Sequence, residues 1–233
     1  MMGTTTMARE STILLVHGAW ANASAWQKVL PLLAEAGTTP IAIALPLTSL
    51  EADTATLARA IALVEGPVLL VGHSYGGAVI TQGGHDPKVT GLVYINGFAP
   101  DEGESAGSLG AGGPPTSLPD NLLPDAEGFL KLTMKGVAES FAQDLTPAEQ
   151  ALIFATQGPA SGPHALGAEI TSPAWKVKPS WYLRGTNDHA IHPELQAMMA
   201  KRMDAKTVDT DSSHVPMLSQ PRKVVDLLLQ AVG

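Results

Sequence analysis

The chain has no cysteine among its 233 residues. That absence excludes disulfide bonds, thiolate metal ligands and a cysteine nucleophile. It suits a reducing compartment, and we expect a cytoplasmic protein. Residues 1–10 are polar and contain no apolar segment typical of a signal peptide, which supports this expectation.

Charged residues and long apolar runs are also scarce. Only 15% of the residues are charged, the net charge is −8, and there is no basic cluster, so we expect no nucleic-acid partner and no membrane partner. No apolar run approaches the roughly 20 residues that span a bilayer. The apolar content of 45% predicts a globular chain with a sizeable core. These properties favour a small-molecule partner and leave the oligomeric state open, a homodimer included.

Short apolar segments alternate with helical patterns through the first hundred residues. This alternation predicts an α/β protein with a mostly parallel, twisted sheet and helices on both faces. The predicted strands are 13–17, 40–45, 68–73 and 89–96, followed much later by 179–185 and 206–209. The predicted helices are 24–36, 53–64 with Asp53 as its cap, 78–84, 193–203 and a closing helix that starts at Pro221.

Residues 99–178 interrupt this alternation. They begin with a loop rich in Gly, Pro and Ser at 103–119, and helical patterns follow at 126–141 and 147–156. We expect no buried strand in this stretch, and a loop of this length in a compact domain is usually functional or disordered. We therefore predict an inserted, largely helical cap at 99–178 over a core formed by 1–98 and 179–233.

A buried strand runs directly into a helix at Gly72-His73-Ser74-Tyr75-Gly76. So tight a bend needs residues with almost no side chain two positions before and two positions after its apex, where Gly72 and Gly76 lie. The pattern G-x-S-x-G between a strand and a helix is known as a nucleophile elbow. It predicts that the hydroxyl of Ser74 lies at the top of the sheet beside a helix N-terminus, placed to act as a nucleophile.

A serine hydroxyl needs a neighbouring base, and imidazole suits this task at neutral pH. His214 alone among the histidines follows the last predicted strand and precedes the last helix, so we predict that it is the base. His73 adjoins Ser74 and should point away from the active face. His17 ends a strand and is expected to make hydrogen bonds to loops.

The base in turn needs a carboxylate that fixes its tautomer and stabilises the imidazolium. Asp188 ends a predicted strand in a Gly-x-x-Asp turn, and we predict that it is this acid. Asp209 and Asp211 are nearer to His214 along the chain but are expected to be surface charges. Functional groups at the carboxyl ends of parallel strands meet at one edge of the sheet, which would bring the three side chains together.

The attacked carbonyl develops a negative oxygen, and N–H groups must point at it in advance. We predict that the backbone N–H groups of Ala19 and Tyr75 form this oxyanion hole. The sequence around Ala19 is equally compatible with an ordinary turn after a strand. His189 and His192 lie three residues apart, but no carboxylate or cysteine cluster completes a metal site, and we expect no metal.

Aromatic residues make up only 5% of the chain. We predict that several of them contribute to the wall of an apolar substrate pocket. They are Trp20, Phe98, Phe129, Phe141, Phe154 and Trp175. The alternative interpretation is that most of them form the core of the cap itself. An apolar pocket would prefer neutral acyl or aryl esters of modest size.

Four segments together resemble the α/β-hydrolase superfamily, and they are Leu15–Trp20, Val71–Gly77, Asn187–Ile191 and Ser212–Leu218. Within it the chain is similar to small capped esterases, including the plant methylesterase and hydroxynitrile lyase group and its bacterial relatives. The resemblance covers the core on both sides of residues 99–178. It implies an α/β-hydrolase fold and a Ser-His-Asp enzyme that uses no cofactor.

Two positions depart from the hydroxynitrile lyases of that group. In those lyases a lysine directly follows the catalytic histidine, where this chain has Val215, and a threonine stands in place of Gly18. Both departures favour ester hydrolysis. We therefore predict a serine carboxylesterase for small to medium apolar esters. A hydroxynitrile lyase or other cofactor-free reaction on the same scaffold is one alternative, and a ligand-sensing receptor that retains the triad is another.

Overall fold

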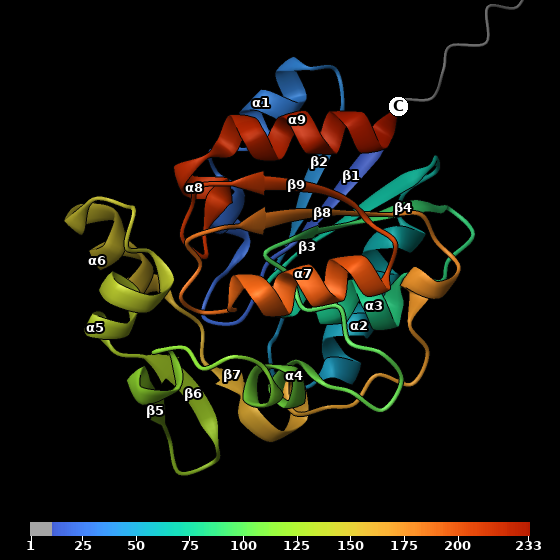
Figure 1. Ribbon diagram of the computed structural model, residues 1–233. Helices are drawn as coiled ribbons and strands as arrows, with labels where there is room; N and C mark the ends of the chain where they lie inside the picture. Colours follow the sequence, from blue (N-terminus) through green and yellow to red (C-terminus); the bar gives the residue numbers. More distant parts are fainter. Residues whose placement is uncertain (1–10) are drawn as a thin grey trace, which may run out of the picture.

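The computed structural model describes residues 11–233, and the expectation about a signal peptide concerns residues outside this range. A six-stranded sheet organises the fold, and all its strands are parallel (Figure 1). The strands are β1 (Thr12–Val16), β2 (Thr39–Ile43), β3 (Val68–His73), β4 (Val89–Ile95), β8 (Ser180–Gly185) and β9 (Lys206–Thr210). Their order in the sheet is β2-β1-β3-β4-β8-β9, so β2 and β9 are the two edges.

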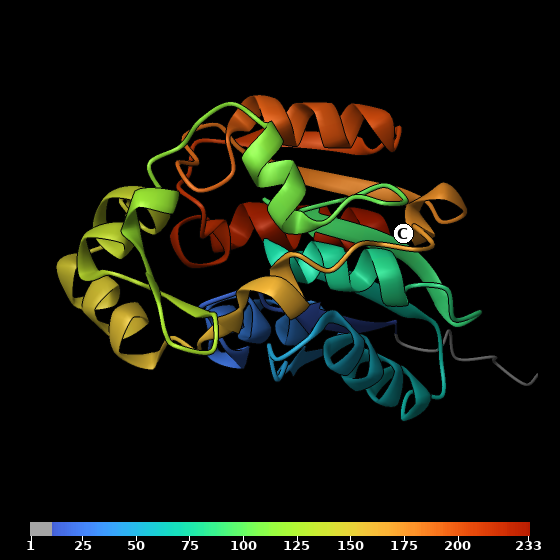
Figure 2. The ribbon, with the colours of Figure 1, turned by 90° about the horizontal axis from the view of Figure 1, so that it is seen from below.

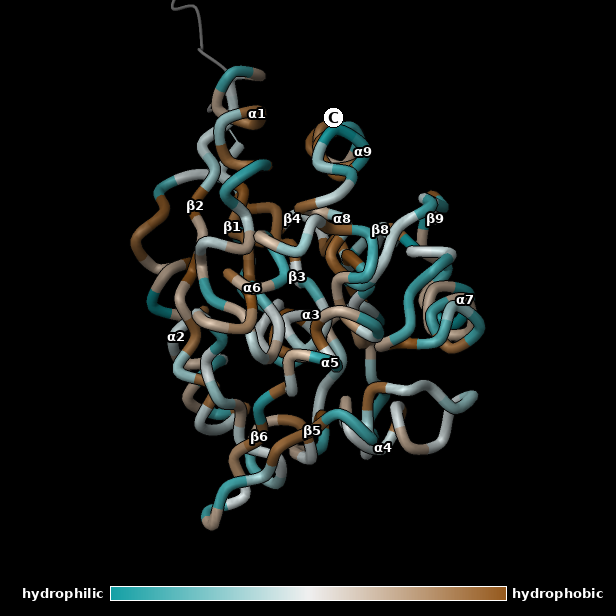
Figure 3. Tube along the Cα trace, turned by 90° about the vertical axis from the view of Figure 1, so that its left-hand side faces the viewer, coloured by the Kyte–Doolittle hydropathy of each residue, from teal (hydrophilic) through white to brown (hydrophobic). Residues whose placement is uncertain are grey.

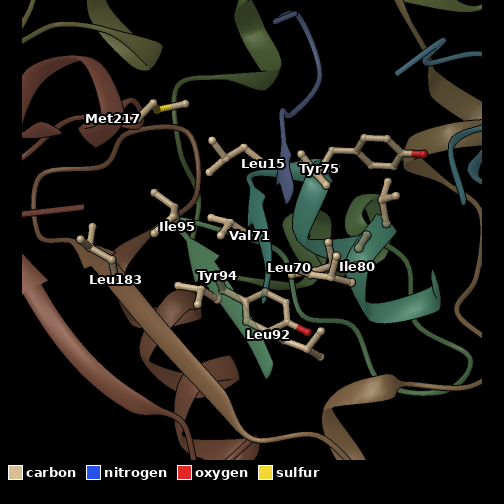
Figure 4. Packing of buried hydrophobic residues seen from close by; sticks show 14 of the residues in the cluster. Leu15, Leu70, Val71, Tyr75, Ile80, Leu92, Tyr94, Ile95, Leu183 and Met217 are labelled. Carbon is tan, nitrogen blue, oxygen red and sulfur yellow. The ribbon is translucent and has the colours of Figure 1, made fainter. Parts of the chain in front are cut away.

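The central strands are apolar along their length because both faces of the sheet are covered. Every residue of β1 and β3 is buried. Leu70 of β3 lies in register between Leu14 of β1 and Leu92 of β4. Figure 4 shows Leu70, Leu92 and neighbouring side chains packed together in this core.

Helices cover the sheet on its two faces (Figure 1). On one face lie α1 (Leu30–Glu35) and the closing helix α9 (Pro221–Val232). On the other face lie α2 (Leu50–Ala62), α3 (Tyr75–Gly83) and α7 (Pro193–Arg202). Figure 3, in which α9 is seen end-on, shows its apolar and polar residues on opposite sides. The short helix α8 (Pro216–Ser219) precedes α9. The predicted α/β fold class is confirmed.

The predicted helix 24–36 is two elements. A 3₁₀ turn spans Ala23–Trp26, and α1 starts only at Leu30. Pro31 lies in the first turn of α1, where its missing N–H costs nothing, but a proline cannot continue a helix from the preceding turn.

The helix predicted to start at Asp53 starts earlier. The N-cap of α2 is Ser49, whose side chain accepts a hydrogen bond from the N–H of Ala52. Asp53 lies in the first turn and is fully buried. The prediction that Asp53 caps this helix is therefore wrong, because Ser49 supplies the acceptor and Asp53 turns inward.

Residues 99–178, here called the cap segment, connect β4 to β8. Much of this segment lies beyond the carboxyl ends of the strands (Figures 1 and 2). Its helices are α4 (Ala106–Gly112), α5 (Met134–Gly136) and α6 (Pro147–Thr156), with π-helical turns at Val137–Phe141 and Gly162–Leu166 and 3₁₀ turns at Pro119–Asn121 and Ala174–Lys176. Its strands form a small antiparallel sheet in the order β5 (Leu122–Pro124), β6 (Phe129–Leu132) and β7 (Ala160–Ser161).

The helix at 147–156 is confirmed with the predicted bounds, but the predicted helix at 126–141 is helical only in its second half, in α5 and the π-helical turn at Val137–Phe141. Strand β6 occupies its first half because a tight turn follows β5. Oδ1 of Asp125 accepts the N–H groups of Glu127 and Phe129, and Gly128 adopts a φ of +81°. The expected loop 103–119 contains the helix α4 and is therefore more helical than predicted, whereas β5, β6 and β7 make the rest of the cap segment less helical than predicted.

No helix among residues 11–233 has the length and apolar character that a bilayer span requires.

Candidate active site

Ser74 lies at the turn between β3 and α3 and adopts φ 53° and ψ −123°. Residues other than glycine rarely adopt a positive φ, so the surroundings must hold this backbone in place. A Cβ added to Gly72 would lie 2.5 Å from the carbonyl oxygen of Gly76. A Cβ added to Gly76 would overlap the carbonyl oxygens of Val16 and His17. The turn therefore requires both glycines, as the motif predicts.

His214 and Asp188 form a buried pair. Nδ1 of His214 donates a hydrogen bond of 2.7 Å to Oδ2 of Asp188. The two residues are 1% and 2% exposed, so water does not compete for this bond. Because Nδ1 is occupied by Asp188, Nε2 of His214 is the nitrogen available to act as a base.

The carboxylate of Asp188 has three further donors. Oδ1 accepts the backbone N–H groups of Ala190 and Ile191 at 2.8 and 3.0 Å. Oδ2 accepts Nε2 of Gln196, on α7, at 2.8 Å. These bonds orient the carboxylate and satisfy oxygens that would otherwise be buried without partners.

His73 holds the loop that carries His214 from the core side. Its Nε2 donates a hydrogen bond of 2.8 Å to the carbonyl oxygen of His214, and the two ring centroids lie 4.8 Å apart. Burial lowers the pKa of His73 well below its ordinary value, and the neighbouring His214 lowers it further. His73 is therefore a neutral structural donor, and it is not among the residues that line the cavity with Ser74.

The loop after β1 passes close to the serine. A Cβ on Gly18 would lie 2.6 Å from Cβ of Ser74. Nδ1 of His17 donates to the carbonyl of Gly18 at 2.8 Å, and its Nε2 accepts the N–H of Leu45 at 3.0 Å. Burial lowers the pKa of His17, which favours the neutral form that this pattern requires. The expected loop hydrogen bonds of His17 are confirmed, and they fix the backbone that leads to Ala19.

One cavity of about 230 Å³ brings the predicted catalytic groups together. Its lining includes Ser74, His214, Ala19 and Tyr75, and the described residues that line it include no Asp, Glu, Lys or Arg. Tyr75 opens α3, where its N–H has no acceptor within the helix. The remaining wall is mostly apolar, with Thr116 as a further polar side chain.

The expected aromatic wall is only partly present. Trp20 and Phe98 line the cavity. Phe141 instead packs against His214, with 4.9 Å between the two ring centroids. Phe154, in α6, is 39% exposed. Phe129 pairs with β7 and does not reach the cavity.

Trp175 is also absent from the cavity wall. Its Nε1 donates to the carbonyl oxygen of Pro100 at 3.0 Å, and the cations of Lys176 and Arg202 lie over its ring. The predictions for Phe129, Phe141, Phe154 and Trp175 are thus corrected, because these side chains pack elsewhere or face solvent. Small residues of α4 take their place, and they are Ala106, Gly107, Gly110 and Ala111.

The competing acids and the histidine pair lie outside the cavity. Asp209 binds Arg184, whose Nε donates to it at 2.8 Å, and Asp211 is exposed. Nδ1 of His189 donates to the carbonyl of Glu139. No group of three or more metal-ligating side chains occurs among residues 11–233.

Gln196 was missed by the sequence reasoning. It belongs to the inward face of α7 together with Leu195 and Met199, and a polar residue in phase with apolar ones signals a buried hydrogen-bonding role. Gln143 and Asp144 of the cap segment were missed as well, and the sequence has no signal that ties them to the site.

Residues 13–227 match a family model described as the alpha/beta hydrolase family. The chain belongs to this family. Among curated members it is 25% identical, over 244 residues, to a pyrethroid hydrolase of Sphingobium wenxiniae, a match that covers 93% of this chain and 85% of the relative. It is 36% identical over 114 residues to a carbendazim hydrolyzing esterase of Nocardioides, which covers 42% of this chain and 47% of that relative.

Solved structures of the family superpose closely. A pyrethroid hydrolase from Sphingobium faniae JZ-2 matches with a TM-score of 0.81 at 25% identity, over 94% of this chain and 96% of that one. Polyneuridine aldehyde esterase matches with a TM-score of 0.83 at 21% identity, over 97% of this chain and all of the other. The second likeness concerns the fold alone.

Proposed function

We propose that this protein is a serine carboxylesterase that hydrolyses neutral, apolar carboxylic esters through an acyl-enzyme. The observation that carries the proposal is the shared cavity of Ser74 and His214, in which the hydrogen bond to Asp188 leaves Nε2 of the base available. The relatives named as hydrolases and esterases agree with this reaction class.

The first half of the reaction forms the acyl-enzyme. Nε2 of His214 takes the proton of the Ser74 hydroxyl while Oγ attacks the ester carbonyl. The N–H groups of Ala19 and Tyr75 stabilise the negative oxygen of the tetrahedral intermediate. The intermediate collapses, the C–O bond to the alcohol breaks, and His214 gives its proton to the departing oxygen.

The second half repeats these steps with water. His214 takes a proton from a water molecule, whose oxygen attacks the acyl carbonyl. The bond between the carbonyl carbon and Oγ of Ser74 then breaks, and the proton returns to the serine. The products are one carboxylic acid and one alcohol, and no cofactor takes part.

The lining of the cavity supports the choice of substrate. A carboxylate or an ammonium group on the substrate would lose its hydration without an oppositely charged partner, because the described lining contains no Asp, Glu, Lys or Arg. Apolar acyl or alcohol groups instead gain by burial. The volume of about 230 Å³ admits small to medium esters.

The decisive experiment is a burst assay with p-nitrophenyl butyrate on wild type and Ser74→Ala. We expect an initial burst of p-nitrophenol followed by turnover, and a loss of at least about 10⁴-fold in the variant. A fluorophosphonate should label Ser74 alone, which mass spectrometry locates. Unchanged p-nitrophenol release by Ser74→Ala would refute the proposal, and cyanide release from mandelonitrile without ester turnover would favour a lyase.

A further inference from the structure

We propose that residues 139–144 of the cap segment position both Asp188 and His214, and we call these residues the strap. The inference deepens the proposed function, since it assigns positioning residues to the same acid–base pair. The strap comprises the end of the π-helical turn and the residues before α6. Within six residues it contacts the chain next to the acid and the chain next to the base.

The strap holds both neighbours of the acid. Nε2 of Gln143 donates a hydrogen bond of 2.6 Å to the carbonyl oxygen of Asn187. The carbonyl of Glu139 accepts Nδ1 of His189 at 3.1 Å. Asn187 and His189 flank Asp188 directly, so the backbone of the acid is fixed on either side.

The strap also holds the chain that carries the base. Oδ2 of Asp144 accepts the backbone N–H of Ser213, the residue before His214, at 2.8 Å. A charged acceptor makes this bond stronger than a bond between neutral groups. The ring of Phe141 packs against the imidazole with 4.9 Å between centroids. The base is thereby held from the cap side, while His73 holds its carbonyl from the core side.

The strap is itself anchored. Nε2 of Gln150, on α6, donates to the carbonyl of Ala142 within the strap and to that of Leu145 just after it. Glu149 of the same helix pairs with Lys28 at 2.6 Å, and Lys28 donates to the carbonyl of Leu218 in the core. These contacts tie the strap to the core through α6. The strap can therefore hold the loops of Asp188 and His214 in position instead of moving with them.

A separation of roles follows from the cavity lining. Gln143 and Asp144 do not line the cavity, so they make no contact with a substrate held there. Misplacing a catalytic group by about 1 Å can cost on the order of a hundredfold in rate. Loosening the strap should therefore lower kcat and leave KM nearly unchanged.

The test uses the full chain with Asp144→Ala and Gln143→Leu. Each substitution removes one hydrogen bond to a catalytic loop, and the leucine also removes an Oε1 that is buried without a partner in the described chain. We expect kcat with p-nitrophenyl butyrate to fall about tenfold to a hundredfold, with KM within about twofold. Asp144→Asn keeps an oxygen that can accept the N–H of Ser213, and it should restore most of the lost kcat.

The matched control is Asp226→Ala, which removes one exposed carboxylate from α9 and should leave kcat unchanged. A second readout needs no turnover: the downfield proton resonance of Nδ1–H of His214 should shift or broaden in Asp144→Ala and Gln143→Leu and stay in place in the control. Circular dichroism identifies any variant that does not fold, and the other variant then carries the test.

Failure of the strap inference and failure of the proposed function give different results. If wild type hydrolyses the ester but both strap variants keep its kcat and its downfield resonance, the strap has no positioning role, while the proposed function stands. If wild type neither turns over nor reacts with a fluorophosphonate, the proposed function fails, and the resonance alone decides whether the strap orders the pair.

Discussion

The hydroxyl of Tyr75 donates a hydrogen bond of 2.7 Å to Oδ2 of Asp53, and both side chains are buried. Oδ1 of the same carboxylate accepts the N–H of Leu47 at 2.8 Å. One carboxylate thus fixes the residue after Ser74 and the loop that follows β2. Since the N–H of Tyr75 is a proposed oxyanion donor, Asp53 anchors that donor from behind the cavity.

We expect Asp53→Ala to lower the free energy of unfolding by about 2–5 kcal/mol, because it leaves two buried donors without an acceptor. Asp53→Asn keeps an oxygen for Leu47 and an amide that can donate to the Tyr75 oxygen, so its loss should be nearer to 1 kcal/mol. Urea unfolding measures both. An Asp53→Ala protein as stable as wild type would show that these hydrogen bonds are unimportant.

The buried histidines predict a pH dependence of stability. Burial lowers the pKa of His17 and of His73 below the ordinary 6.5. The unfolded chain then binds more protons than the folded one, so the stability present above pH 6.5 is lost as the pH falls. Each histidine contributes a slope of up to about 1.4 kcal/mol per pH unit. Urea unfolding between pH 7.5 and 5.5 should show this decline, and a shallower one in His73→Gln. An identical slope in that variant would contradict the assignment.

Gly110 provides a test of what limits substrate size. A Cβ at this cavity-lining position would meet only Cζ of Phe98, at 3.8 Å, so Gly110→Leu should fit without strain and fill part of the cavity. We expect kcat/KM for p-nitrophenyl octanoate to fall about tenfold or more, and that for the acetate to change little. The matched control is Gly112→Leu on the same helix, where a Cβ meets nothing within 4 Å. A uniform change across chain lengths would argue against a size limit at Gly110.

The elbow should not tolerate a methyl group at Gly76. Gly76→Ala would press a Cβ against the carbonyl oxygens of Val16 and His17, which are main-chain atoms of a central strand and its end. We expect a loss of at least about 2 kcal/mol in stability, together with loss of esterase activity. Thermal unfolding beside Gly112→Ala checks this, since the control should match wild type or exceed it slightly. A fully stable, active Gly76→Ala would overturn this account of the turn.

The sheet could be predicted from the sequence because its signals are local. Strands such as β3 are short apolar runs that end in glycine or a polar turn, and the elbow adds a constraint that few other structures satisfy. Ser74, Asp188 and His214 each follow a strand, so their convergence depends only on parallel topology. The sequence was therefore sufficient to predict that His214 and Asp188 lie together. Their catalytic roles belong to the proposed function.

The cap segment was harder to predict because its structure depends on distant contacts. Strand β6 is only four residues long and pairs with β7, which lies about thirty positions further along the chain. Of the predicted aromatic residues only Trp20 and Phe98 line the cavity, and α4 supplies another part of the wall with glycine and alanine. Asp144 reaches Ser213 across 69 positions, a contact that no periodic pattern encodes.

The two outer strands of the sheet bear on how the protein avoids aggregation. Pro40 in β2 has no N–H to offer a strand from another molecule. At the opposite side, Lys206 and Asp209 place charges along β9, and the pairing of Asp209 with Arg184 keeps a charged side chain across it. A β-strand from another molecule would find no N–H donor at Pro40 on one edge and exposed charged side chains on the other, so the sheet resists growth by edge-to-edge addition.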